Sequence, residues 1–103
     1  MISNTQIGTA NTTLYSVPPG ESHAVVLIVL CNTDDAANKT ITLYAVPSGN
    51  SAADSNMIIN DLVIPAGDTI IYNLEKFILN SGDSIVGIAD ATGVTVTFSV
   101  MPL

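Results

Sequence analysis

The sequence predicts an all-β protein, a single antiparallel β-sandwich of about seven or eight short strands. Apolar and polar residues alternate with period two in several short segments, most clearly from Val94 to Met101. Clusters of Pro, Gly, Asn, Asp and Ser separate these segments, as turns do between strands. The sequence has no long segment with the amphipathic period of a helix. These features favour a jelly-roll or an immunoglobulin-like sandwich.

The composition favours protein partners over nucleic acid or membrane. The 103 residues are enough for one domain. The chain has a formal net charge of −7 and contains 2 Lys and Arg residues in total. So few basic residues argue against binding to nucleic-acid phosphates or to an anionic membrane. Only 11% of the residues are charged, which is typical of a surface that packs against other proteins.

The first part of the chain is expected to hold an arm and two strands. Residues 1–11 are mostly polar and predict an extended N-terminal arm, and residues 12–103 form the sandwich domain. A strand over residues 12–17 ends at two prolines, which cannot donate to a strand ladder. Residues 23–32 contain an unbroken apolar run, which predicts a central strand buried on both faces. This run is too short for a membrane helix, which needs about 20 residues.

The rest of the chain alternates between strands and turns. Strands are predicted over residues 40–46, 57–64, 69–74, 84–89 and 94–101. Within one of these strands, the alternation places Ile71 on the same side as Thr69 and Asn73. The longest irregular stretch, residues 48–56, is rich in Ser, Ala, Asn and Asp, and long loops often carry function.

The titratable residues do not form a recognisable catalytic set. His23 is the only histidine and has no nucleophile motif nearby, so we interpret it as structural or as a surface residue. Cys31 is the only cysteine and lies in the apolar run, which indicates a core residue and assembly in the cytoplasm rather than secretion. The acids are scattered, and several follow turn glycines. We expect no enzymatic activity, no catalytic residue, no cofactor and no metal ligand, with a weak cation site left open.

The central strand raises the question of what covers its second apolar face. Strict alternation would place Val25 with Leu27 and Val29 on one face, and Ile28 with Leu30 on the other. The candidate covers are the N-terminal arm, the loop at residues 48–56 and a neighbouring subunit. We therefore expect a homo-oligomer, with a trimer favoured, or docking on a larger lattice. The candidate partner-binding residues lie in the arm and the loop: Ile2, Ile7, Ser48, Asn50, Ser51 and Asp54.

Several strand-and-turn segments together carry a family resemblance. They are Thr13 to Gly20, the strand that ends in Cys31-Asn32-Thr33-Asp34, Ile41 to Gly49, Ile64 to Thr69, and Leu79 to Ile85. With these segments, nearly the whole chain resembles small virion structural proteins of tailed bacteriophages, especially those of cyanophages and other aquatic phages. The resemblance implies a non-enzymatic β-sandwich that is part of the virion and is assembled in the host cytoplasm.

The resemblance leaves the place in the virion open. A capsid decoration or cement protein is favoured, which would bind across capsomers and contact the major capsid protein or other virion proteins. A neck, tail or fibre-attachment component is the alternative. A carbohydrate-binding module and a fragment of a depolymerase or lysin are competing functions of other classes.

Overall fold

The protein is an all-β sandwich, as the sequence predicts. The computed structural model describes residues 1–103, except for the side chains of residues 74–76. Its regular elements are β1 (Ile2–Gln6), β2 (Thr12–Ser16), β3 (His23–Asn32), β4 (Lys39–Val46), the short 3-10 helix η1 (Asp54–Asn56), β5 (Met57–Ile64), β6 (Thr69–Leu79), β7 (Ser84–Ala89) and β8 (Val94–Pro102).

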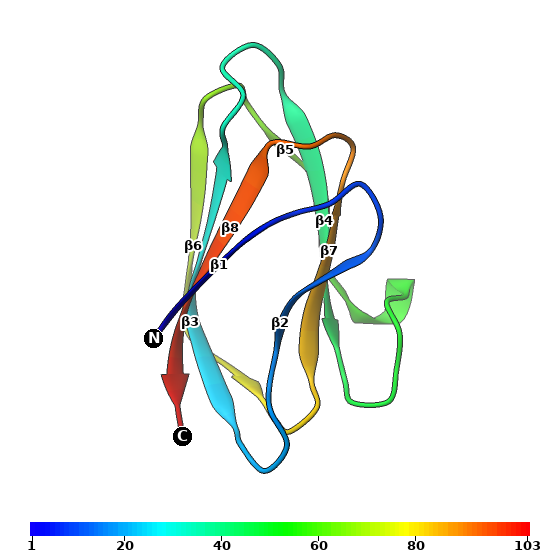
Figure 1. The fold of residues 1–103 in the computed structure, drawn as a ribbon, viewed down its shortest axis with the longest axis vertical. Coiled ribbons are helices and arrows are strands. Elements are labelled where there is room, and N and C mark those ends of the chain that lie inside the picture. Colours follow the sequence, from blue (N-terminus) through cyan, green and yellow to red (C-terminus); the bar gives the residue numbers. More distant parts are fainter.

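The strands form two antiparallel sheets that face each other (Figure 1). The strand order is β1-β8-β3-β6 in one sheet, here called the first sheet, and β2-β7-β4-β5 in the other, the second sheet. The chain pairs as a folded-over hairpin, β1 with β8, β2 with β7, β3 with β6 and β4 with β5. This pairing defines a jelly roll, so the connectivity decides between the two sandwich types that the sequence left open.

The core lies between the two sheets. Alternate residues of β8 point into it, as expected from the period-two alternation of apolar and polar residues in this strand. The side chains that are 0% exposed include one aromatic residue and many β-branched ones, which pack well against a pleated sheet. They include Ile7, Val25, Ile41, Ile64, Ile85, Val94, Val96 and Phe98.

The free N-terminal arm is not confirmed. Residues Ile2–Gln6 form β1, which pairs antiparallel with β8 at the edge of the first sheet. Ile7 then turns inward, where its side chain is fully buried and its N–H donates to the Val94 carbonyl at 2.9 Å. The chain crosses from there to β2 in the second sheet (Figure 1). Backbone pairing with β8 supplies the order that an isolated polar segment lacks.

A β-bulge changes which residues of β3 face the core. The register of β3 against both β6 and β8 shifts between Val25 and Leu27. The extra residue restarts the alternation, so Val25 shares the inner face with Ile28 and Leu30. The predicted division of this strand by strict alternation, with Val25 beside Leu27 and Val29, is therefore wrong.

Candidate functional site

The outer face of the first sheet is the most distinctive surface of the molecule. Residues directly opposite each other in an antiparallel pair point to the same side of a sheet. Val29 lies opposite Ile71 on β6 and Thr97 on β8, which fixes the residues on this side. We call it the open face; its described residues are Ile2, Asn4, Gln6, Ala24, Leu27, Val29, Cys31, Thr69, Ile71, Asn73, Ile78, Thr95, Thr97, Ser99 and Met101.

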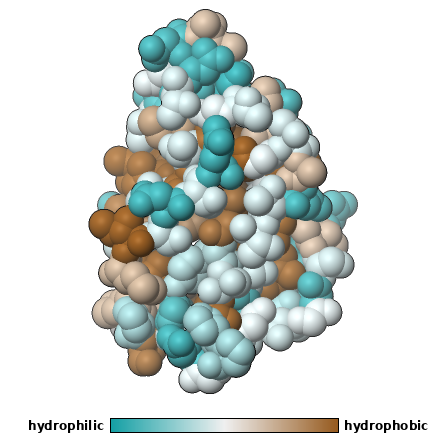
Figure 2. Space-filling model, in the orientation of Figure 1, coloured by the Kyte–Doolittle hydropathy of each residue, from teal (hydrophilic) through white to brown (hydrophobic). Residues whose placement is uncertain are grey.

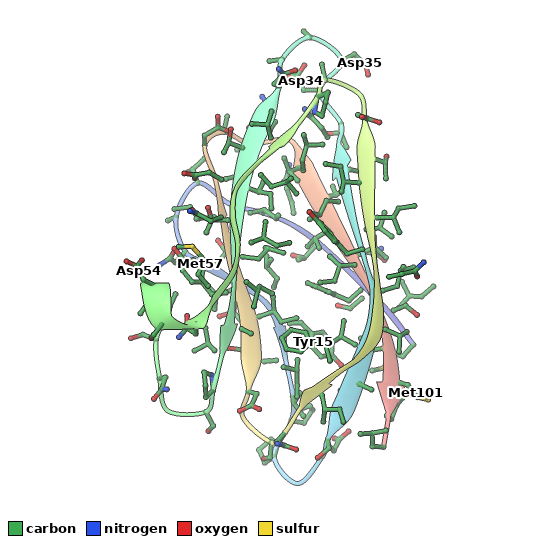
Figure 3. The ribbon with its side chains drawn as sticks, turned by 180° about the vertical axis from the view of Figure 1, so that it is seen from behind. Tyr15, Asp34, Asp35, Asp54, Met57 and Met101 are labelled. Carbon is green, nitrogen blue, oxygen red and sulfur yellow. The ribbon has the colours of Figure 1, made fainter. Side chains whose placement is uncertain are left out.

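The open face mixes apolar side chains with neutral polar ones and is uncharged throughout its described residues. Four large apolar side chains project from it, because Ile2 is 71% exposed, Ile71 60%, Ile78 50% and Met101 45%. Threonine and serine side chains from β8 lie among them. Figure 2 shows brown surface gathered at the left margin, on the side of the first sheet, and Figure 3 shows Met101 pointing away from the sandwich.

Neither intramolecular cover expected from the sequence lies over the open face. β1 extends the first sheet in its own plane, so it adds Ile2 to the face instead of shielding it. The loop between β4 and β5 lies beside the second sheet, where Figure 3 shows Asp54 and Met57 on the side away from Met101. The half-buried Leu27 and Val29 are therefore shielded mainly by neighbours within their own sheet.

The predicted partner-binding residues do not come together. Ile2 lies on the open face, whereas Ile7 is in the core and inaccessible to a partner. Ser48, Asn50, Ser51 and Asp54 are exposed in the β4–β5 loop, on the far side of the molecule.

Hydrogen bonds within the β4–β5 loop and to Asp83 hold this loop in place. The Asn56 side-chain amide donates to the Ser51 carbonyl and accepts from the Ala53 N–H, both at 3.0 Å. The Ser48 N–H donates to the Asp83 carboxylate at 2.9 Å.

Sequence reasoning missed Ile71, Ile78 and Met101 as surface residues of interest. Only Ile71 carried a signal, since it is an isoleucine on the polar side of an alternating strand.

Apart from the open face, the structure contains a small network of polar side chains around His23, whose side chain is buried. Nε2 of His23 contacts the Glu21 carboxylate at 3.0 Å, and Nδ1 contacts the Tyr15 hydroxyl. When Nε2 donates to Glu21, Nδ1 is left to accept from the tyrosine. Burial and the nearby Glu21 charge raise the pKa of Tyr15. The phenol therefore stays protonated and serves as a donor.

This network lies beside a hollow of about 390 Å³, lined in part by Met1, Pro18 and Pro102. The three residues of the network line the same hollow, and both ring nitrogens of His23 have protein partners. The network ties β2 to β3, and His23 is buried rather than at the surface.

Several aspartates accept hydrogen bonds from backbone N–H groups in or near the turns. Asp34 accepts from the Ala36 N–H at 2.8 Å and from the Lys39 ammonium at 3.0 Å. These hydrogen bonds, led by the backbone N–H, lower the pKa of Asp34. Asp90 accepts from the Thr40 N–H in the same way. Within the described residues, no three His, Cys, Asp or Glu side chains gather as a metal site would require.

Comparisons with known proteins provide no relative: no family model matches this chain, and no curated protein does. No described helix is long and apolar enough to cross a membrane. The site is a β-sheet surface without a charged side chain among its described residues, and depletion of charge is typical of surfaces that pack against other proteins.

Proposed function

We propose that this protein is a non-enzymatic structural component of a tailed-phage virion, with capsid decoration as its favoured role. The observation that carries the proposal is the open face, which has no charged side chain among its described residues in a chain of net charge −7. The assignment to a virion comes from the resemblance of the sequence to small virion structural proteins of tailed bacteriophages. Viral capsid proteins use jelly rolls, as do lectins and cupins, so the fold is compatible with this role without deciding it.

The open face suits a cement protein energetically. Apolar side chains held on a rigid sheet lose little conformational freedom when a partner covers them. Burial contributes about 25 cal/mol for each Å² of apolar surface, so a covered face supplies several kcal/mol before the cost of association. Each copy bound to the major capsid protein or to other virion proteins would add this energy to the cost of separating capsomers.

The polar groups have partners that are compatible with a non-enzymatic protein. His23 contacts Tyr15 and Glu21 through its two ring nitrogens, and Asp34, Asp83 and Asp90 accept hydrogen bonds from backbone N–H groups. The structure does not favour a carbohydrate-binding module, which stacks sugars on exposed aromatic rings. Phe98 is fully buried, and the other four aromatic residues, Tyr15, Tyr44, Tyr72 and Phe77, are half-buried; Figure 3 shows Tyr15 between the sheets.

The test is to find the protein on particles of the phage whose genome encodes it. Mass spectrometry of purified particles should detect the chain, and immunogold labelling should mark the whole head surface. Particles assembled without the protein should lose their DNA at a lower temperature than complete particles. Labelling at a single vertex or along the tail would assign it to the neck or tail instead. Absence of the chain from purified particles would overturn the proposal.

A further inference from the structure

We propose that the open face binds a second copy of this chain, packed face to face about a two-fold axis. This inference rests on the same surface as the proposed function and goes beyond it: a second copy covers the open face of the free protein and leaves it when the face docks on other virion proteins. Three properties of the molecule support a second copy as the occupant: the placement of its described charges, the size of the face and its position on a single side of one sheet.

Among the residues whose side chains the structure describes, the placement of charge permits self-association through this face and disfavours it elsewhere. Two copies each carry a net charge of −7, so they repel each other wherever acidic surfaces meet. Every acid with a described side chain lies in a turn, in η1 or on the second sheet. They are Glu21, Asp34, Asp35, Asp54, Asp61, Asp68, Asp83 and Asp90. The open face is the surface on which two copies can approach without bringing these carboxylates into contact.

The size of the face matches the smallest stable interfaces. Its four strands have 5, 9, 10 and 11 residues. With strands about 4.8 Å apart and a rise of about 3.3 Å per residue, the face covers roughly 500 to 600 Å². Two such faces bury roughly 1,000 Å² or more, which is the lower limit for a specific interface. Facing sheets can pack about 10 Å apart, with their strands nearly aligned.

The shape of the patch favours a two-fold dimer over a ring. A ring requires two different patches on each subunit, one for each neighbour. The open face is instead one side of one sheet, and a single surface pairs with its own copy about a two-fold axis. The trimer expected from the sequence is therefore an outcome that would count against this inference.

The test compares two substitutions on edge strands of opposite sheets. Ile71 on β6 and Val63 on β5 are both β-branched, both point outward, and are 60% and 51% exposed. Ile71→Asp places a carboxylate on the open face, and in a two-fold dimer it adds one to each side. We expect the dissociation constant to rise by about 100-fold or more. Val63→Asp adds the same charge to the second sheet and should leave association unchanged.

The measurement is the mass in solution from micromolar to millimolar protein, by light scattering and sedimentation equilibrium. The wild type and Val63→Asp should reach twice the chain mass of 10.7 kDa, while Ile71→Asp stays at one chain mass over the same range. Circular dichroism checks that both variants are folded. A wild-type monomer, a trimer, or equal behaviour of the two variants would overturn the inference.

Cys31 gives a second readout that needs no substitution. It is the only cysteine of the chain, half-buried on the open face. Its reaction with a maleimide should slow as the protein concentration rises through the dissociation constant. A rate that is independent of concentration would contradict a dimer through this face. A monomer that is nevertheless present on phage particles overturns only this inference, whereas a dimer that is absent from particles overturns only the proposed function.

Discussion

Apolar side chains project from the outer faces of both sheets: Ile71 on β6 in the first sheet and Val63 on β5 in the second are each more than half exposed. The second sheet differs by carrying charge. Asp61 lies on its outer face, where its N–H donates to the Thr42 hydroxyl at 3.1 Å. Asp61 and Asp90 line a hollow of about 210 Å³ on the same side. Exposed apolar side chains therefore occur on both outer faces, whereas among the described residues charge occurs on the second one only, and depletion of charge is what marks protein interfaces generally.

The largest difference in stability is expected between substitutions of an inner and of an outer isoleucine in the N-terminal segment. Ile7→Asp removes a fully buried side chain, which alone costs about 2 to 5 kcal/mol, and it also buries a carboxylate. Since domains of this kind are stable by about 5 to 15 kcal/mol, this variant should be largely unfolded. Ile2→Asp, at the exposed position, should change the free energy of unfolding by no more than about 0.5 kcal/mol.

Urea unfolding followed by circular dichroism measures both variants. A folded Ile7→Asp protein with normal stability would contradict the burial of this residue and revive the free arm. Ile2→Asp should instead weaken self-association, because Ile2 lies on the open face.

An intermediate effect is expected when the same substitution is made on the two outer faces. Thr42→Val on the second sheet leaves the Asp61 N–H without its partner in a partly buried place, which should cost about 1 to 3 kcal/mol. Thr97→Val on the open face removes only an acceptor for the exposed Asn4 amide, and water replaces it. This second change should stay within about 0.5 kcal/mol. Equal losses in urea unfolding would show that hydrogen bonding does not distinguish the two faces.

The smallest effect is expected from a charge that lies outside both faces. The pKa of Asp34 is lowered in the folded state, so its contribution to stability is present above the unfolded pKa and is lost as the pH falls through the folded pKa. Asp34→Asn should therefore weaken the loss of stability in acid without changing self-association at neutral pH. Thermal unfolding from neutral to acidic pH measures this slope. An acid slope identical to that of the wild type would mean that Asp34 has no part in it.

Local sequence signals located most of the strands. The bounds of β3, β5 and β7 agree with the predicted segments, because apolar runs and period-two alternation end at turn residues there. β1 was missed because its polar side chains carry no strand signal of their own. Its order comes from pairing with β8, whose residues are far away in the sequence. The bulge in β3 was missed for a different reason: in an unbroken apolar run, no polar side chain marks where the alternation restarts.

The candidate site was only partly predictable for the same reasons. The apolar run of β3 indicated that the strand has a second apolar face, which something must cover. Ile71 indicated an apolar residue on the otherwise polar side of its strand. Placing Ile2, Ile78 and Met101 on the same surface required the strand order of the first sheet, which no local pattern specifies.

The folded-over pairing of the chain also sets an order of completion during synthesis. All strands of the second sheet have been made once β7 has left the ribosome, whereas the first sheet waits for β8. Until then β1 has no neighbour, because the partner of Asn4 is Thr97, 93 positions later. We therefore expect the open face to form after the second sheet is complete, so that a nascent chain cannot bind its neighbours on a polysome through an unfinished surface.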